Sequence, residues 1–202
     1  MQNGRNAELP ECMLQRETQT LSALTPQDAG ESRGLASKGV SATQGLDVSL
    51  VIKSPPSRVL KAFFDADALG AWWQVAHSVT TPRVLGPYAI EWALTDFRDE
   101  VLGRLGGVLR GTVMQFDPGR GFFVADVFWL PPDGDPIGPM ALEVTLSPVT
   151  SSDDAASGSE IATKVHVVQT GFEEDARWRR YYEIVGAGWG RALKTLKMLL
   201  EK

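Results

Sequence analysis

One acidic residue interrupts an otherwise apolar stretch, and it is the first candidate for chemistry in this sequence. The stretch covers residues 122–130, FFVADVFWL, and its alternate positions are Phe122, Val124, Asp126, Phe128 and Leu130. Successive side chains of a strand point to opposite faces of a sheet, so these five share one face. If that face is buried, loss of hydration raises the pKa of Asp126, and the carboxyl needs a hydrogen-bond partner, a ligand or a proton-transfer role.

A bulge in the same strand gives the opposite arrangement. One extra residue shifts the alternation, which leaves Asp126 at the rim and turns Phe123, Val127 and Trp129 inward. Both arrangements stay open from the sequence. The two arrangements have different functional consequences, because only an inward Asp126 could act as a catalytic group on a bound molecule.

Aromatic side chains elsewhere are candidates for the wall of a binding cavity. Tyr88, Ile90 and Trp92 alternate along one strand-like segment, so we expect them to face inward together. In the paired Trp72 and Trp73, one ring can belong to the core and the other to a ligand platform. A C-terminal helix carries an apolar stripe at steps of three and four, made of Trp178, Tyr182, Val185, Trp189, Leu193, Leu196 and Leu200.

Three glycines interrupt that helix, at positions 186, 188 and 190. Each costs about 1 kcal/mol relative to alanine in a helix interior. They predict close packing or a bend, or else room for a cavity wall.

Other chemical motifs fail on their context. His166 lies between two valines and is expected to face solvent, and His77 has no ligand-type neighbours, so we predict no metal site. The Gly-x-Ser-x-Gly pattern around Ser32 has no preceding strand, as a nucleophile elbow requires. The glycines near Trp189 lack the dinucleotide-binding spacing. Cys12 is the only cysteine, so it forms no internal disulfide. We assign no catalytic residue and no cofactor.

The aromatic residues divide the 202-residue chain unevenly. All six Trp, three Tyr and eight Phe lie at or after Phe63. We therefore expect residues 1–45 to be a disordered or weakly ordered tail, with at most one docking helix, and residues 46–202 to form one domain. Residues 150–160, TSSDDAASGSE, are predicted to be a flexible hairpin loop.

The net charge of −5 excludes several partners. No basic stripe exists for a nucleic acid or an anionic lipid surface. Apolar runs are too short to cross a bilayer, and the acidic N-terminus does not resemble a signal peptide. The sequence thus predicts a cytoplasmic protein without membrane insertion.

The elements follow an α+β order. Residues 46–53 alternate as a strand, and a Ser54 cap followed by proline starts a helix. Asp65 or Asp67 caps a second short helix that ends near Trp73. Strands are then expected over residues 88–94, 108–116, 122–130, 140–148 and 161–170, in an antiparallel meander before the long C-terminal helix.

Several segments resemble one family. KAFFDADALGAWW, LGPYAIEW, LRGTVMQFDPGRGFFV, IATKVHVVQTGF and VGAGWGRALKTLKMLLE occur in the order and spacing of the activator of heat-shock-protein-90 ATPase homologue-like family, within the START-like (SRPBCC) superfamily. The resemblance covers residues 46–202. It implies a helix-grip fold, in which a curved sheet of six or seven strands surrounds the C-terminal helix with a ligand cavity between them.

Three departures fall on pocket positions of that family. Gln74 and Val75 replace the Gly-Pro that commonly follows Trp-Trp, Gln169 replaces a histidine in the last strand, and Asp126 stands where tryptophan is frequent. The ligand of the family is therefore not transferable to this chain. The tail also lacks the additional folded domain of the eukaryotic co-chaperone.

Three functions remain open. The leading hypothesis is a domain that binds a small hydrophobic or aromatic molecule without catalysis; the second is a cyclase- or dehydratase-like enzyme that uses Asp126, with Tyr88 or Gln169 orienting the substrate. The third is a co-chaperone-like module that binds a protein through its outer surface, and a homodimer contact also remains open. The predicted ligand-binding residues are Trp73, Tyr88, Ile90, Trp92, Phe122, Val124, Asp126, Phe128, Gln169 and Trp189.

Overall fold

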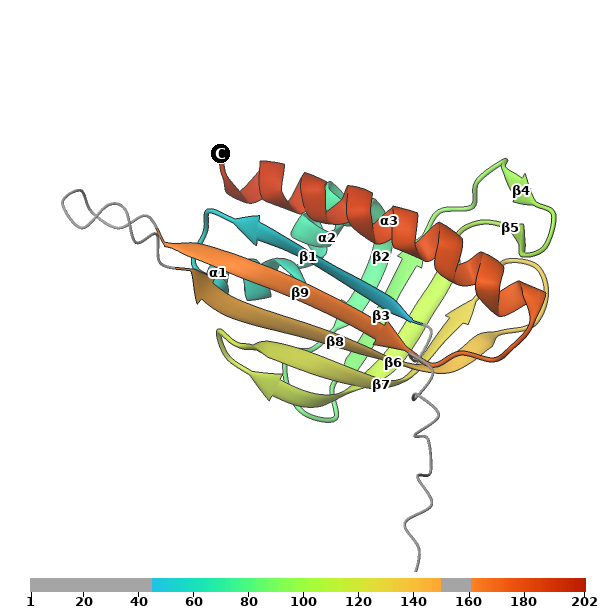
Figure 1. Cartoon of the computed structure of the whole chain (residues 1–202), viewed down its shortest axis with the longest axis horizontal. Helices are drawn as coiled ribbons and strands as arrows, with labels where there is room; N and C mark the ends of the chain where they lie inside the picture. Colours follow the sequence, from blue (N-terminus) through green and yellow to red (C-terminus); the bar gives the residue numbers. More distant parts are fainter. Residues whose placement is uncertain (1–44, 150–160) are drawn as a thin grey trace, which may run out of the picture. The chain divides into compact units, whose positions relative to one another are not determined.

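The backbone forms one seven-stranded antiparallel sheet, a two-stranded hairpin and three helices in the computed structural model, which describes residues 45–149 and 161–202 (Figure 1). The expected tail, Cys12, Ser32 and the loop at 150–160 lie outside the described residues. Strand order in the large sheet is β1-β9-β8-β7-β6-β3-β2. The strands are β1 (Leu46–Ile52), β2 (Val75–Thr80), β3 (Pro87–Trp92), β4 (Arg98–Asp99), β5 (Gly103–Arg104), β6 (Gly107–Asp117), β7 (Gly121–Leu130), β8 (Ile137–Val149) and β9 (Ala162–Thr170), and the helices are α1 (Pro56–Ala62), α2 (Ala66–Trp73) and α3 (Ala176–Leu200).

The two short helices begin at caps of different kinds. Pro55 is the N-cap of α1 and Pro56 is its first residue, so the predicted Ser54 cap is wrong by one position. Proline suits this place because the first helical N–H groups have no intrahelical acceptor. Asp65 caps α2 as predicted, since its Oδ1 accepts the Ala68 N–H at 3.0 Å. Gln74 then ends α2 in the left-handed conformation, at φ 58°.

A bulge in β7 decides which of its side chains face inward. Val124 pairs with Leu142 and Val127 with Met140, so β7 has one residue more than β8 across this interval. Asp126 takes up the extra residue with φ 51° and is exposed. Val127 and Trp129 are consequently buried, while Phe128 lies under the guanidinium of Arg110 on the outer face, at 5.4 Å. The inward placement of Asp126 and Phe128 is therefore wrong.

Helix α3 covers the inner face of the curled sheet (Figure 1). It begins at Asp175, whose Oδ1 accepts the Trp178 N–H at 2.8 Å. Most of the predicted stripe is buried, but Tyr182 and Val185 are half-buried and Tyr181, outside the stripe, is 2% exposed. Near the other end of α3, Lys197 donates from Nζ to the Val51 carbonyl of β1 at 2.7 Å, which holds the helix beside the sheet edge.

One end of the inner face is filled by aromatic side chains. Phe63 and Phe64, at the end of α1, pack edge-on against Phe122 with ring centroids 5.6 and 4.8 Å away, and Phe64 packs likewise against Tyr88 at 5.5 Å. Such pairs contribute about 0.5–1.5 kcal/mol each beyond their buried area. This end of the inner face is therefore a closely packed aromatic core.

A hairpin that the sequence did not predict lies beside the N-terminal half of α3 (Figure 1). We call residues 93–106, which contain β4 and β5, the flap. It leaves the sheet after β3 and returns at β6, and Gly106 takes φ 117° at the return, where a side chain would clash with the Ala93 carbonyl. The flap thus extends the wall around the inner face beyond the edge of the seven-stranded sheet.

Of the helices in residues 45–149 and 161–202, none is both long and apolar enough to cross a membrane.

A candidate ligand cavity between the sheet and the C-terminal helix

A cavity of about 650 Å³ lies at the end of the inner face that the aromatic core leaves unfilled. Its wall is formed by α2, α3, the flap and strands β3, β6, β7 and β9. The volume falls within the range of about 300–1,000 Å³ usual for small-molecule sites. Apolar side chains dominate the wall, including those of Leu102 and Leu105 from the flap and Leu109 from β6.

Five tryptophans line the cavity: Trp72, Trp73, Trp92, Trp129 and Trp189. The Trp73 ring stacks on Trp72 with centroids 4.9 Å apart and contacts Trp189 at 4.3 Å and Trp92 at 5.3 Å. These contacts join α2, β3 and α3 into one aromatic surface.

The indole N–H groups are largely used within the protein. Trp72 donates to the Ala62 carbonyl at 2.9 Å, Trp92 to the Trp73 carbonyl at 3.0 Å, and Trp129 to the Gly106 carbonyl at 2.9 Å. These rings are therefore fixed in orientation and offer their apolar surfaces to a ligand. The arrangement favours shape and apolar contact over hydrogen bonding.

One neutral polar pair faces the cavity from its buried side. Gln169 of β9 donates from Nε2 to Tyr181 Oη of α3 at 2.9 Å, and the same nitrogen lies 3.1 Å from Met140 Sδ. Gln169 is 1% exposed and Tyr181 is 2% exposed. Burial raises the pKa of Tyr181, so its hydroxyl stays protonated at neutral pH and serves as a hydrogen-bonding group.

The mouth of the cavity is marked by the lining residues that are exposed. These are Gln74 after α2, three residues at the start of the flap, and Arg191 on α3; the flap residues are Ala93, Leu94 and Thr95. A ligand would therefore pass between the end of α2, the flap and the middle of α3.

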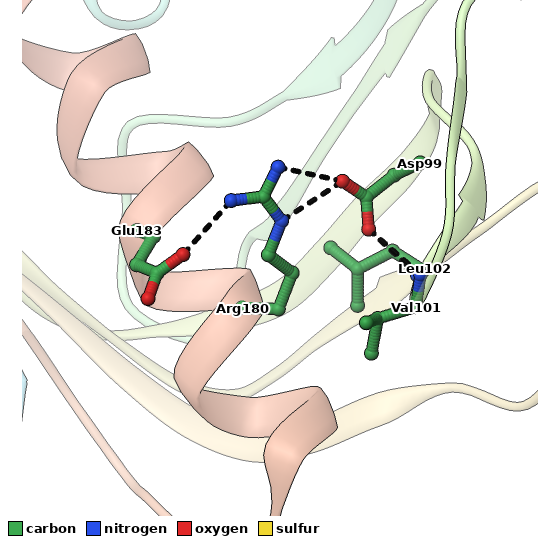
Figure 2. Close-up of polar contacts among 5 residues, drawn as sticks. All are labelled: Asp99, Val101, Leu102, Arg180 and Glu183. Atoms are coloured by element: carbon green, nitrogen blue, oxygen red, sulfur yellow. Dashed lines mark hydrogen bonds and ion pairs between the residues drawn. The ribbon is translucent and has the colours of Figure 1, made fainter.

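A buried carboxylate attaches the flap to α3. Asp99 is 5% exposed, and its Oδ1 accepts the N–H groups of Val101 and Leu102, both at 3.0 Å (Figure 2). Its Oδ2 receives Nε and Nη2 of Arg180, both at 2.8 Å, and Arg180 also donates from Nη1 to Glu183 Oε2 at 2.8 Å. The Arg180 hydrogen bond chiefly holds the pKa of Asp99 below its usual range. This pair fixes the segment that places Leu102 in the cavity wall.

A second depression, between the flap and the turn after β7, has a different character. It is open, and both of its arginines are bonded within the protein: Arg98 pairs with Asp133 at 2.7 Å, and Arg177 donates to the Asp135 carbonyl. We interpret these contacts as supports of the flap.

The ten predicted site residues separate into three groups. Four line the cavity: Trp73, Trp92, Gln169 and Trp189. Four are buried in the aromatic core or beside it and do not reach the cavity: Tyr88, Ile90, Phe122 and Val124. Asp126 and Phe128 lie on the other face because of the bulge. The alternate inward residues therefore do not all line the cavity, because Phe63 and Phe64 pack against Phe122, and Phe64 also against Tyr88.

An enzyme that works through Asp126 has no support in this geometry. The carboxyl is exposed on the outer side of β7, away from Gln169, and Tyr88 is enclosed in the core. The Tyr88 hydroxyl has no hydrogen-bond partner in the described residues, and burial raises its pKa. It is a core residue with an uncompensated hydroxyl.

Both histidines lie outside the cavity in exposed pairs. His77 Nδ1 is 3.3 Å from Glu91, and His166 Nε2 is 2.8 Å from Asp47. Within the part of the chain that the structure describes, no three His, Cys, Asp or Glu residues converge as a metal site would require.

Sequence reasoning missed several lining residues. Trp129 follows from the bulge arrangement, which the sequence left open. Tyr181 lies within the span of the predicted stripe, directly before its member Tyr182, but was not counted in it. Leu102 and Leu105 belong to the flap. Arg191 is exposed on α3 and borders the mouth.

A curled antiparallel sheet that surrounds a long C-terminal helix, with two short helices after the first strand, is the helix-grip fold of START-like domains. The chain belongs to the activator of Hsp90 ATPase homolog 1-like protein family (AHSA1), whose sequence model matches residues 53–201. The sequence-based prediction of this fold and family is confirmed.

Solved structures agree on the fold. A protein from Mesorhizobium loti is 22% identical with a TM-score of 0.53, over 77% of this chain and 96% of that one. A protein from Chromobacterium violaceum is 24% identical with a TM-score of 0.50, over 78% and 97%. A protein from Mycobacterium smegmatis is 16% identical with a TM-score of 0.56, over 78% and 91%. No curated protein matches the sequence significantly.

Proposed function

We propose that this protein binds a small apolar or aromatic molecule in the cavity between the sheet and α3. The observation that carries the proposal is the tryptophan wall, in which Trp72, Trp92 and Trp129 have their N–H groups occupied by backbone carbonyls. These three rings therefore offer a ligand apolar surface and no hydrogen-bond donor. Removal of apolar surface from water stabilises a complex by about 25 cal/mol per Å² before the costs of association.

Intrinsic fluorescence tests the proposal directly, because five of the six tryptophans line the cavity. A panel of fatty acids, fatty alcohols and polycyclic aromatic compounds is titrated into the protein while tryptophan emission is recorded. We expect saturable quenching or a spectral shift with members that fit about 650 Å³. A flat response to every member contradicts the proposal.

Gly188 offers a specific way to block the cavity. It lines the cavity, and a Cβ added there meets no described atom within 4 Å. The Cβ of a leucine at this position is therefore accommodated, and Gly188→Leu should extend its side chain into the cavity and favour the helix by up to about 1 kcal/mol. We expect the affinity for these compounds, measured from the fluorescence titration, to fall at least tenfold.

Gly190 supplies the matched control on the same helix. A Cβ there also meets no described atom within 4 Å, but Gly190 is not among the residues that line the cavity. Gly190→Leu should bind the same compounds as the unmodified protein. Equal binding by both leucine variants would place the ligand elsewhere.

A further inference from the structure

Arg191 is the single charged residue among the described residues that line the cavity. Its side chain is exposed at the mouth, and its guanidinium has no carboxylate partner in residues 45–149 and 161–202. Two other cations of α3 differ in this respect, because Arg180 pairs with Asp99 and Glu183, and Lys197 pairs with Glu201. Arg191 is thus a free cation beside an apolar cavity.

We infer that the ligand is an amphiphile with an anionic headgroup, a carboxylate, which Arg191 holds at the mouth while the apolar body lies against the tryptophans. The inference rests on the proposed function and adds the chemical class and orientation of the ligand. A guanidinium suits this task because its planar fork matches the two oxygens of a carboxylate.

The opposite end of the cavity does not suit an anion. Tyr181 precedes Arg191 by ten residues, which corresponds to about 15 Å along an α-helix. At that end Gln169 and Tyr181 are neutral and almost fully buried, and no charged residue lines the wall there within the described part of the chain. A charged group placed there would lose its hydration without a counter-ion. The headgroup must therefore remain at the mouth.

Other mouth residues are compatible with a hydrated headgroup. Gln74 and Thr95 are exposed polar residues on the remaining sides, and Thr195 lines the cavity one turn beyond Arg191, where its hydroxyl donates to the Arg191 carbonyl at 3.2 Å. No acidic residue borders the mouth among the described lining residues, so nothing there repels a carboxylate.

The test compares three probes of equal chain length: dodecanoate, 1-dodecanol and dodecyltrimethylammonium. The two ionic probes are titrated below their critical micelle concentrations, and 1-dodecanol below its solubility limit. In the unmodified protein we expect dodecanoate to bind about fivefold more tightly than 1-dodecanol, the size of a good exposed ion pair, and the cation to bind more weakly. Arg191→Gln should remove the preference and leave the affinity for 1-dodecanol unchanged. Raising the salt concentration to 0.5 M should reduce the preference as well, because exposed pairs are screened.

Lys194→Gln is the matched control, since Lys194 is an exposed cation on α3 that is not among the lining residues. It should keep the preference for dodecanoate. Equal affinities of the three probes for the unmodified protein, or loss of the preference in Lys194→Gln to the same extent as in Arg191→Gln, overturn the inference while the proposed function stands. If none of the probes binds and Gly188→Leu changes nothing, the proposed function itself fails.

Discussion

Arg180 donates two hydrogen bonds from α3 to one oxygen of Asp99, while the other oxygen of Asp99 accepts two N–H groups of the flap itself. Both oxygens of this buried carboxylate are therefore used, one to shape the flap and one to attach it to the helix (Figure 2). The pair holds the flap segment that places Leu102 in the cavity wall. Because it contacts only the flap and α3, its loss should disorder the flap without disturbing the sheet.

Loss of this attachment should loosen the flap. Asp99→Asn keeps the shape of the side chain but removes its charge, and we expect a loss of about 1–2 kcal/mol, because Arg180 remains partly hydrated. Amide hydrogen exchange at Val101 and Leu102 should accelerate, and exchange in β8 should change little. Arg98→Gln is the control: it breaks the exposed pair with Asp133 and should cost less than about 1 kcal/mol. Equal effects of the two variants would show that the buried pair has no special role.

Low pH should remove the stabilisation that the pair of Asp99 and Arg180 provides. The pKa of Asp99 is lower in the folded protein than in the unfolded chain, where an aspartate titrates near 3.9. The stabilisation is therefore complete above about pH 5 and is lost as the pH falls through the folded pKa. The difference in melting temperature between the unmodified protein and Asp99→Asn should be constant from pH 7 to 5 and shrink towards pH 2.5. A difference that grows in acid contradicts the assignment.

Two tyrosine hydroxyls should respond oppositely to the same deletion. Tyr88 Oη is buried without a described partner, so Tyr88→Phe should leave stability unchanged or raise it by up to about 1 kcal/mol. Tyr181 Oη accepts from Gln169, so Tyr181→Phe should lower stability by about 1–2 kcal/mol. Urea denaturation of both variants measures the contrast. Destabilisation by Tyr88→Phe equal to that of Tyr181→Phe would reveal a partner for the Tyr88 hydroxyl.

The bulge predicts how position 126 tolerates substitution. Asp126 has φ 51°, a region open to glycine and acceptable to asparagine, whereas a Cβ-branched residue is strained there. Asp126→Gly and Asp126→Asn should remain within about 0.5 kcal/mol of the unmodified protein, and Asp126→Val should lose about 1–2 kcal/mol. Thermal unfolding provides the comparison, and ligand affinity should not change in Asp126→Asn. Weaker ligand binding by Asp126→Asn would indicate that Asp126 does contribute to the binding site.

The order of elements could be predicted because local patterns determine it. Alternation marked β1 and β9, proline marked the start of α1, and Asp65 or Asp67 marked the start of α2. The family resemblance then implied the helix-grip fold for this order of elements. Strand β7 shows where this reasoning ends. The alternation holds from Phe122 to Val124 and then reverses, because Asp126 is an extra residue with positive φ. The alternation of apolar residues in the sequence does not reveal where such a bulge occurs.

The cavity was less predictable because it depends on contacts between distant elements. Trp73, Trp92, Gln169 and Trp189 were anticipated, but nothing local distinguishes the part of the sheet that Phe63 and Phe64 cover from the part that lines the cavity. The flap contains only two strands of two residues each, too short for an alternating pattern. Its position depends on Asp99 meeting Arg180, 81 residues away.

Gly188 has a consequence for how the size of the cavity can change. The empty space beside α3 exists at that point because a side chain is missing, and a Cβ would fit there without displacing the surrounding backbone. Under the proposed function, substitution by alanine, valine or leucine should reduce the space for a ligand in graded steps, and each of these residues favours a helix over glycine. Selectivity for ligand size could then change through a single position of α3.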